Sequence, residues 1–523
     1  MALNHTHIHL KFFLRILKSL ALLESKNLLL PKIAVIVLFM FSLNTLFEDY
    51  LDKFFGFHDL GLINDFLANT VHRGKTFYVS TLEVNHLSWH FSPTLFLITP
   101  FYLIFDSQFV FLALNALAIY FSISLLSKLA FDVLKKNDVS SEFIWFAISA
   151  FVILTSLGTF TINVLGAGHF EVFYIPIVPL IFYFYCKGFK TWLIFALMGL
   201  AWGIRQDAGF ILSFQLISLL FIPSRFILAD RKPRKKVLIF GALFSILATI
   251  FITMVIIPLY GTDANWHATR LWGHLGENYS EIFFKLLLHP GILFDELKNS
   301  AYIHLNEGFL FINFLNPLVG ILNNIPGFLY YTTQSIERKS LFWYTSSFLL
   351  PGIYFSFMVG LCYLGKWNQT LISYRRGTFY RAIGPVLLFI LVLCGLNRVF
   401  IDSNKKFSTY EMKYSFAIPE NQLEKEIHGV LQKCRGHVLS ASSDFKTFIF
   451  LPNYLMKYLL DRYEKSDLVF FVPGETPFLS AFPNLEEFKE NLDENPEYSL
   501  VYKHEMFMVY ARSGIDCLDK TIL

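Results

Sequence analysis

Residues 237–259 read VLIFGALFSILATIFITMVIIPL, a long run without a single charged side chain. About 20 such residues suffice for a helix to cross the hydrocarbon core of a bilayer. The run directly follows the basic cluster RKPRKK at 231–236. Because cytoplasmic loops of membrane proteins concentrate Lys and Arg, we expect this helix to begin on the cytoplasmic side.

The composition of the whole chain agrees with a membrane protein. Of its 523 residues, 54% are hydrophobic and only 16% are charged, whereas soluble domains carry about 25% charged residues. The net charge of +4 is unevenly spread, because residues 405–523 hold 14 Lys and Arg against 18 Asp and Glu. This asymmetry predicts a membrane part and a mildly acidic soluble part, and it gives no indication of nucleic-acid binding.

Apolar runs of similar length recur along the first 401 residues and predict an all-α polytopic membrane protein with about eleven transmembrane helices. We place the spans at 31–47, 108–131, 142–165, 171–186, 191–204, 208–228, 237–259, 308–322, 325–334, 344–364 and 380–401. Asn323–Pro326 is predicted to turn a short hairpin. The segment 93–105 contains two prolines and is too short to cross, so we expect it to lie at the outer leaflet or dip into it.

The positions of the basic clusters predict which loops lie on which side of the membrane. The clusters are Lys11–Lys26, Lys135/Lys136, Lys187/Lys190, Arg231–Lys236 and Lys366–Arg376. Placing them inside gives a cytoplasmic segment at 1–30, a membrane domain at 31–401 with outer loops 48–107 and 260–307, and an extracytoplasmic soluble domain at 405–523.

The soluble domain is predicted to be a small α/β unit. Its β-rich runs are 437–440, 467–472, 499–503 and 506–510, and the segments 453–464 and 485–492 read as helices. Cys434 and Cys517 lie in this part of the chain and could form a disulfide.

Polar residues gather in the loops that this topology places outside. In the first loop, FGFHDLGLINDFLANTVHRGKTFY, apolar residues recur at helical spacing while Asp59 and Asp65 fall mostly on other faces. We therefore expect a helix in the interface that presents carboxylates above the membrane. Asp59 could be a helix N-cap, or it could act as a general base or metal ligand.

Three further corners carry candidate residues. His90 precedes a short apolar helix that starts near Pro93, and a structural role is the simpler interpretation for it. His169 and Glu171 occur in the otherwise apolar sequence GAGHFEVFYIP. Ionisable groups in such a place are costly unless they are paired or solvated, which favours function.

In the sequence GIRQDAGF, Arg205 and Asp207 could pair with each other, or Arg205 could face a phosphate, to which its planar fork is suited.

Several classes of function are disfavoured. The apolar spans lack mid-span Asp, Glu, Lys or Arg, the groups that ion-coupled transporters usually bury. Neither a P-loop nor a dinucleotide fingerprint, an HExxH or a GxSxG motif occurs in the chain. The outer loop 260–307 is expected to form two partly amphipathic helices over the outer rim.

The order of the outer motifs resembles the bacterial predicted membrane proteins of the domain of unknown function 2079. The motifs are HDLGLINDFL, HFSPTLFLITPFYLIF, GHFEVFYIPIVPL, RQDAGF and TRLWGHLGENYSEIFFKLLLHP. That family is similar in layout to the GT-C glycosyltransferases, which take sugars from polyprenyl-phosphate donors at the outer face. The resemblance implies a GT-C-like fold and a place in the bacterial inner (cytoplasmic) membrane.

The same resemblance implies roles for the candidate residues. Asp59 matches the acidic residue of the first outer loop that acts at the reaction centre, and Glu171 a second acidic position. Arg205 matches a basic group near the lipid phosphate, and His90 belongs to a proline-rich motif from which this chain departs by having one proline. His169 and Asp207 complete the expected substrate-binding set.

The implied partners are a polyprenyl-phosphate-linked sugar and membrane lipid, and the need for a divalent metal is left open. A non-enzymatic flippase or export partner for lipid-linked sugars, or a membrane scaffold, is the alternative.

Overall fold

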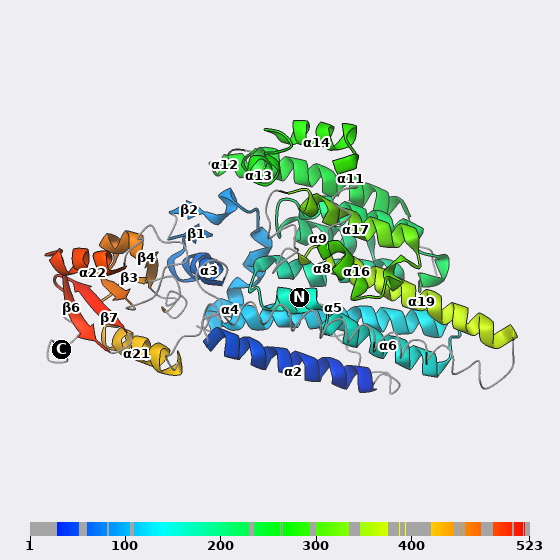
Figure 1. The fold of residues 1–523 in the computed structure, drawn as a ribbon, viewed down its shortest axis with the longest axis horizontal. Coiled ribbons are helices and arrows are strands. Elements are labelled where there is room, and N and C mark those ends of the chain that lie inside the picture. The colour runs from blue at the N-terminus through cyan, green and yellow to red at the C-terminus, as the bar shows by residue number, and fades with distance from the viewer. Residues whose placement is uncertain are drawn as a thin grey trace, which may run out of the picture. The chain divides into compact units, whose positions relative to one another are not determined.

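The computed structural model describes residues 29–51, 60–80, 83–104, 109–229, 235–261, 263, 265–292, 300–333, 346–374, 386, 393, 420–443, 451, 455–471, 485–504, 507–515 and 517. The chain forms two compact units (Figure 1). The first contains Met1–Ser42, Asn115–Gly166 and Glu171–Tyr410, and the second contains Leu43–Leu114, Ala167–Phe170 and Glu411–Leu523. The helices α2 and α5 pass from one unit into the other.

The first unit is built of apolar helices. They are α2 (Leu29–Leu51), α5 (Phe109–Lys136), α6 (Ser141–Ser156), α7 (Thr159–Leu165), η6 (Phe170–Phe173), α8 (Tyr174–Lys187), α9 (Thr191–Trp202), α10 (Ala208–Ser218), η7 (Leu219–Phe221), η8 (Ser224–Phe226), α11 (Lys235–Phe251), the π-helix η9 (Ile252–Ile256), α12 (Ile257–Leu259), α13 (Trp266–Trp272), α14 (Tyr279–Leu288), α16 (Ser300–Glu307), η10 (Ile312–Phe314), α17 (Pro317–Tyr331) and α19 (Leu350–Tyr374).

Among the described residues, three helical stretches are long and apolar enough to cross a membrane: Phe109–Lys136, Phe170–Lys187 and Lys235–Leu259. Shorter apolar helices accompany them, such as Thr191–Trp202 and Ala208–Phe221. The mostly helical membrane class is therefore as expected, while a total of about eleven spans stays a prediction. The last predicted span, 380–401, lies outside the described residues apart from two isolated positions.

The helix α11 (Lys235–Phe251) has one face packed against other helices and one exposed face. Leu238 and Ala242 of α11 are buried, and Gly241 lies so close to Met198 that a Cβ at this position would clash with it. On the other face, large apolar side chains are about half exposed: Ile239, Phe240, Leu243, Phe244, Leu247, Ile250 and Phe251. Such a stripe is suited to contact with lipid chains.

Some of the predicted spans differ from the structure. The predicted hairpin at Asn323–Pro326 is wrong, because α17 runs through it as one helix. Asn323 and Asn324 donate their side-chain amides to the carbonyls of Val319 and Gly320, at 2.9 and 2.8 Å, so these amides are satisfied within a continuous helix. The predicted span 142–165 is also divided, into α6 and α7.

The membrane core contains a chain of buried asparagines. Asn313 donates to Asn306 at 2.6 Å, and Asn306 donates to Asn324 at 3.2 Å. Asn323 donates to Ser218 of α10 at 3.2 Å. These bonds join α16, η10, α17 and α10, in the way that polar side chains hold neighbouring helices together in lipid.

The second unit includes the loop 48–107, which was predicted to lie outside. It contains α3 (Leu62–Arg73), the antiparallel strands β1 (Tyr78–Val79) and β2 (Val84–Asn85), η4 (His86–Ser88), η5 (Pro93–Leu97) and α4 (Thr99–Ile104). The segment expected not to cross the bilayer is thus a five-residue 3-10 helix followed by a six-residue α-helix. Together they are shorter than the roughly 17 residues that a crossing needs.

The C-terminal part of this unit is an α/β fold, as expected. Its elements are α21 (Glu420–Lys433), β3 (Ser440–Ser443), β4 (Met456–Leu459), η13 (Leu460–Lys465), β5 (Leu468–Phe471), α22 (Leu485–Glu494), β6 (Tyr498–Lys503) and β7 (Met508–Arg512). The sheet order is β4-β3-β5-β7-β6, with β3 parallel to β4 and β5, and β7 antiparallel to β5 and β6. Figure 1 shows α22 beside this sheet.

The prediction of a helix at 453–464 is wrong. The middle of this segment is the edge strand β4, and its end is η13. Long-range pairing with β3 decides its conformation, and a local pattern does not contain this information. Leu460 of η13 then packs with Phe488, Leu492 and Tyr510 in the core of the domain. Cys434 and Cys517 form the disulfide that the sequence allowed.

Candidate functional site

Arg205 lies in the corner between α9 and α10, where the chain reverses direction. Gly203 is the C-cap of α9 and Asp207 is the N-cap position of α10. The Asp207 side chain makes no capping hydrogen bond to α10. Instead its two oxygens accept from Nε and Nη2 of Arg205, both at 2.5 Å, in a bidentate pair.

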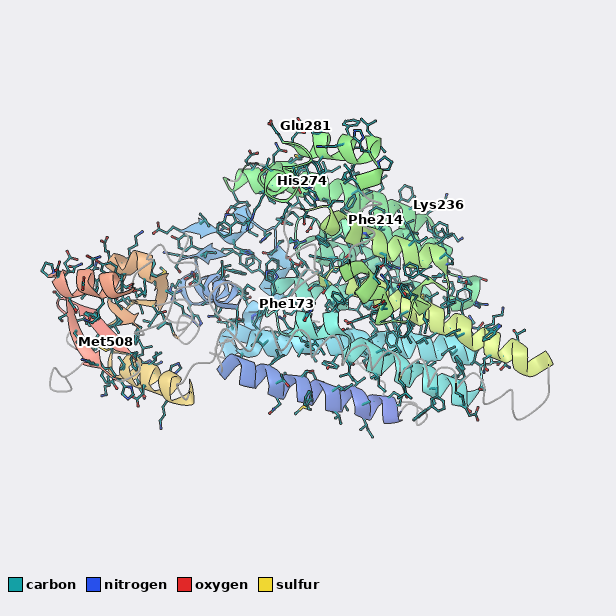
Figure 2. All side chains as sticks on the ribbon, in the orientation of Figure 1. Phe173, Phe214, Lys236, His274, Glu281 and Met508 are labelled. Carbon is teal, nitrogen blue, oxygen red and sulfur yellow. A yellow bond between two sulfur atoms is a disulfide. The ribbon has the colours of Figure 1, made fainter. Side chains whose placement is uncertain are left out.

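Glu171 and Tyr330 complete the coordination of the guanidinium. Nη1 of Arg205 donates to Oε1 of Glu171, which lies in η6 just before the labelled Phe173 in Figure 2. Nη2 also donates to the Tyr330 hydroxyl of α17 at 2.8 Å. Four of the five N–H groups of the guanidinium are engaged by these bonds.

The burial of this cluster is uneven. The side chains of Arg205 and Glu171 are 2% and 1% exposed, while that of Asp207 is 37% exposed. One guanidinium and two carboxylates give the cluster a net charge of −1. Burial alone would lower the pKa of Arg205. The neighbouring Asp207, Glu171 and Tyr330 nevertheless hold this pKa well above its usual range. Arg205 is therefore a fixed cation with one accessible counter-ion.

Aromatic rings pack against the guanidinium of Arg205 and against each other. The guanidinium carbon lies 4.5 Å from the centre of the Phe348 ring, a cation–π contact. Gln215 donates to the Phe348 carbonyl at 2.9 Å and accepts from the Tyr174 hydroxyl at 2.6 Å. The Tyr174 ring meets Phe348 edge to face at 4.7 Å. This framework leaves Arg205 little freedom to move.

None of the residues that build this framework was predicted from the sequence. Tyr174 follows Glu171 by one helical turn, which is a signal that local spacing could have given. Tyr330, Gln215 and Phe348 come from distant parts of the chain and carry no such signal. The expected neighbours Glu171, Arg205 and Asp207 are brought together, and the Arg205–Asp207 ion pair is formed.

His90 and His169 lie in the second unit, in an aromatic cluster. The rings of both meet Phe170, at 5.7 Å for His90 and 4.3 Å for His169. His86, which the analysis of the sequence did not single out, stacks on Phe66 at 4.3 Å and shares a 2.9 Å hydrogen bond with Ser92. Burial lowers the pKa of His86 to about 3, so its imidazole is neutral at physiological pH.

The expectation that the first outer loop presents Asp65 above the membrane is wrong. Asp65 is fully buried and accepts hydrogen bonds from the Ser80 amide at 2.7 Å, the Ser80 hydroxyl at 2.9 Å and Asn69 at 3.2 Å. Burial raises its pKa to about 6, against the opposing effects of Ser80, Lys457 and Arg73. The polar face of α3 is turned inward because the β1–β2 hairpin folds over it.

Asp59 lies outside the described residues, just ahead of α3, so the structure does not place its carboxylate. Within the described part of the chain, no group of three His, Cys, Asp or Glu side chains is arranged to hold a metal ion.

These features define a helical membrane protein with a buried ion cluster at a helix corner. Residues 51–430 match the family model described as "Predicted membrane protein (DUF2079)", and the chain therefore belongs to this family.

Among solved structures, the chain is similar to ArnT from Cupriavidus metallidurans bound to undecaprenyl phosphate, with 11% sequence identity and a TM-score of 0.43 over 92% of this chain and 98% of that chain. A search of curated proteins finds no match.

Proposed function

We propose that this protein is a membrane glycosyltransferase of the GT-C type, which transfers a sugar from a polyprenyl-phosphate donor at the outer face of the membrane. The observation that carries the proposal is the bidentate pair of Arg205 and Asp207. A buried guanidinium whose fork is filled by a 37% exposed carboxylate offers a place that a phosphate of similar geometry can take.

In the proposed reaction, Arg205 exchanges Asp207 for the donor phosphate. An acceptor hydroxyl attacks the anomeric carbon, the bond from that carbon to the phosphate oxygen breaks, and the phosphate leaves with the bonding electrons. Asp59 takes the proton of the acceptor hydroxyl. Arg205 stabilises the charge that develops on the phosphate, and Glu171 keeps the guanidinium in position.

The remaining candidates are assigned to the substrate. Asp207, once released from Arg205, accepts a hydrogen bond from a sugar hydroxyl, and His90 and His169 are assigned to substrate binding. We assign residues 31–401 to the membrane and residues 405–523 to the outer face. The disulfide Cys434–Cys517 supports this orientation, because such bonds persist in oxidising compartments outside the cytoplasm.

Copurification tests the donor. The protein is purified in mild detergent, and bound lipids are extracted and identified by mass spectrometry. We expect a polyprenyl-phosphate-linked sugar from wild type and a several-fold loss from Arg205→Lys, which keeps the charge but not the fork. Arg225→Lys is the matched control, because Arg225 stacks on Tyr363 at 4.6 Å in another corner of the same unit.

Envelope glycans separate transfer from transport. If the protein is a transferase, a null strain lacks one sugar and accumulates the lipid-linked donor at the outer face, where membrane-impermeant periodate can oxidise it. A donor that accumulates but is protected from periodate would instead identify a flippase. Equal lipid content in wild type and Arg205→Lys would refute the role of Arg205.

A further inference from the structure

The helix α14 in the outer loop 260–307 is formed by a strong local signal. Asn278 is its N-cap and accepts from the Glu281 amide at 3.0 Å. Glu281 reaches back to accept from the Glu277 amide at 2.9 Å and from the Asn278 side chain at 2.6 Å. This arrangement resembles a capping box, which fixes where the helix begins and hence which way each later side chain points.

One face of α14 packs against its own hairpin. Ile282 is buried with Ala268 of α13 and Leu275 of the connecting turn, and Tyr279 and Leu286 pack against the same small core. Lys285 donates to the His274 carbonyl at 3.2 Å, which ties the helix to the turn. Figure 2 labels His274 and Glu281 on this hairpin.

A second face of α14 is apolar and exposed. Phe283, Phe284, Leu287 and Leu288 are 62%, 56%, 62% and 71% exposed. At about 100° per residue they span an arc of about 140°, and the charged Glu281 and Lys285 lie outside this arc. Four large apolar side chains gathered in this way are costly in water and mark a contact surface.

The neighbouring chain indicates what covers this face. The hairpin follows α12, at the end of the apolar stretch Lys235–Leu259, which is long and apolar enough to cross a membrane and has an open apolar stripe suited to lipid. Leu259 and Tyr260, at the junction, are 75% and 45% exposed. Only five residues separate Tyr260 from Trp266, the first residue of α13, so α13 begins within about 20 Å of the end of this candidate span.

We propose that α14 lies in the bilayer, with Phe283, Phe284, Leu287 and Leu288 in contact with lipid hydrocarbon chains. The hairpin α13–α14 is then a monotopic element of the membrane domain, anchored by its apolar face while Glu281 and Lys285 stay in the polar interface. This inference does not depend on the proposed enzymatic function.

Depth-dependent quenching tests the proposal on the full chain in lipid nanodiscs. Azidophenylalanine replaces Phe284, or the adjacent Lys285 as the matched control, and carries a small environment-sensitive dye. We expect lipids with brominated chains to quench the dye at 284 several-fold more than at 285, and aqueous iodide to show the reverse order. A label at Leu287, which is equally exposed, repeats the measurement on the same face.

Two results would overturn the proposal. Equal iodide quenching at 284 and 285 would place the apolar face in water. Protection of 284 from both quenchers would show that protein covers it, and photocrosslinking of the same variant with its azide left unlabelled would then reveal whether the cover is a second copy of the chain or another protein.

Discussion

Arg205 and Asp65 are both buried charges in polar corners, but their partners differ in kind. Arg205 is held by two carboxylates from η6 and the α10 start, one of them 37% exposed. The hydrogen bonds that hold Asp65 come from the neutral donors Ser80 and Asn69 of its own loop, while the cations Lys457 and Arg73 act on it through their charge. A charged and partly accessible counter-ion can be exchanged for a ligand, whereas short-range neutral donors hold a loop in one conformation. The Arg205 cluster is therefore suited to binding a ligand, and the Asp65 cluster is suited to holding its loop in place.

The largest effect should come from removing the cation of the Arg205 cluster. Arg205→Met leaves Glu171 buried without its guanidinium, and such a loss costs about 3–5 kcal/mol. We expect a marked fall in the thermal stability of the purified protein. The double variant Arg205→Met with Glu171→Gln removes both charges and should recover part of it. No recovery would show that the ion pair is not the source of the loss.

Asp59→Asn should lower transfer by about 10²-fold or more if this carboxylate is the general base. The exchange is nearly isosteric, so we expect equal protein levels. The measurement is the rescue of the envelope glycan in a null strain. Asp65→Asn is unsuitable as its control because Asp65 is buried, and Glu83→Gln, exposed in the same loop, takes that place. Full rescue by Asp59→Asn would exclude the catalytic role.

The Asp65 centre should make stability depend on pH. Its folded pKa of about 6 lies above the ordinary value of a carboxyl, so the folded state holds its proton more tightly than the unfolded state. Stability therefore falls as pH rises through about 6. Between pH 5 and 7.5 we expect Asp65→Asn to gain about 1–1.5 kcal/mol relative to wild type. Parallel thermal-shift curves for both proteins would contradict this.

The smallest effect is expected at an exposed pair of the same unit. Lys465 and Glu83 form an ion pair with side chains 47% and 41% exposed. Exposed pairs of this kind contribute up to about 1 kcal/mol and often nothing measurable. Lys465→Ala should change the melting temperature by no more than a degree or two and should leave lipid copurification unchanged. A larger loss would mean that this contact secures the C-terminal domain to the first outer loop.

The apolar helices could be predicted because a span of about 20 apolar residues has few other stable structures. The helical conformation of Asn323–Pro326 could not be predicted, because Asn is common in turns. Only the neighbouring helices and the carbonyls of α17 make a helix suitable here. The strand β4 was mistaken for a helix because its partner β3 decides its conformation. For β4 the deciding contact lies outside the local window, and for α17 the local bonds to Val319 and Gly320 act together with contacts from neighbouring helices.

The candidate site shows the same limit. Arg205 and Asp207 are two residues apart, and their pairing was one of the two interpretations that spacing allowed. Glu171 was singled out by its apolar surroundings. Tyr330 and Phe348 were not, because aromatic residues are abundant in this chain and only the folded arrangement brings these two to the guanidinium. The inward turn of Asp65 depends on a hairpin that begins five residues after α3 ends.

The disulfide between Cys434 and Cys517, 83 residues apart, has a consequence for how the protein is made. All five strands of the sheet lie between the two cysteines. On the proposed outer-face location of residues 405–523, the bond closes only after this whole segment has reached an oxidising compartment, so export of the segment precedes the final locking of the sheet. The proposal therefore couples export to oxidative maturation, and a thiol-trapping pulse-chase would separate the two steps in time.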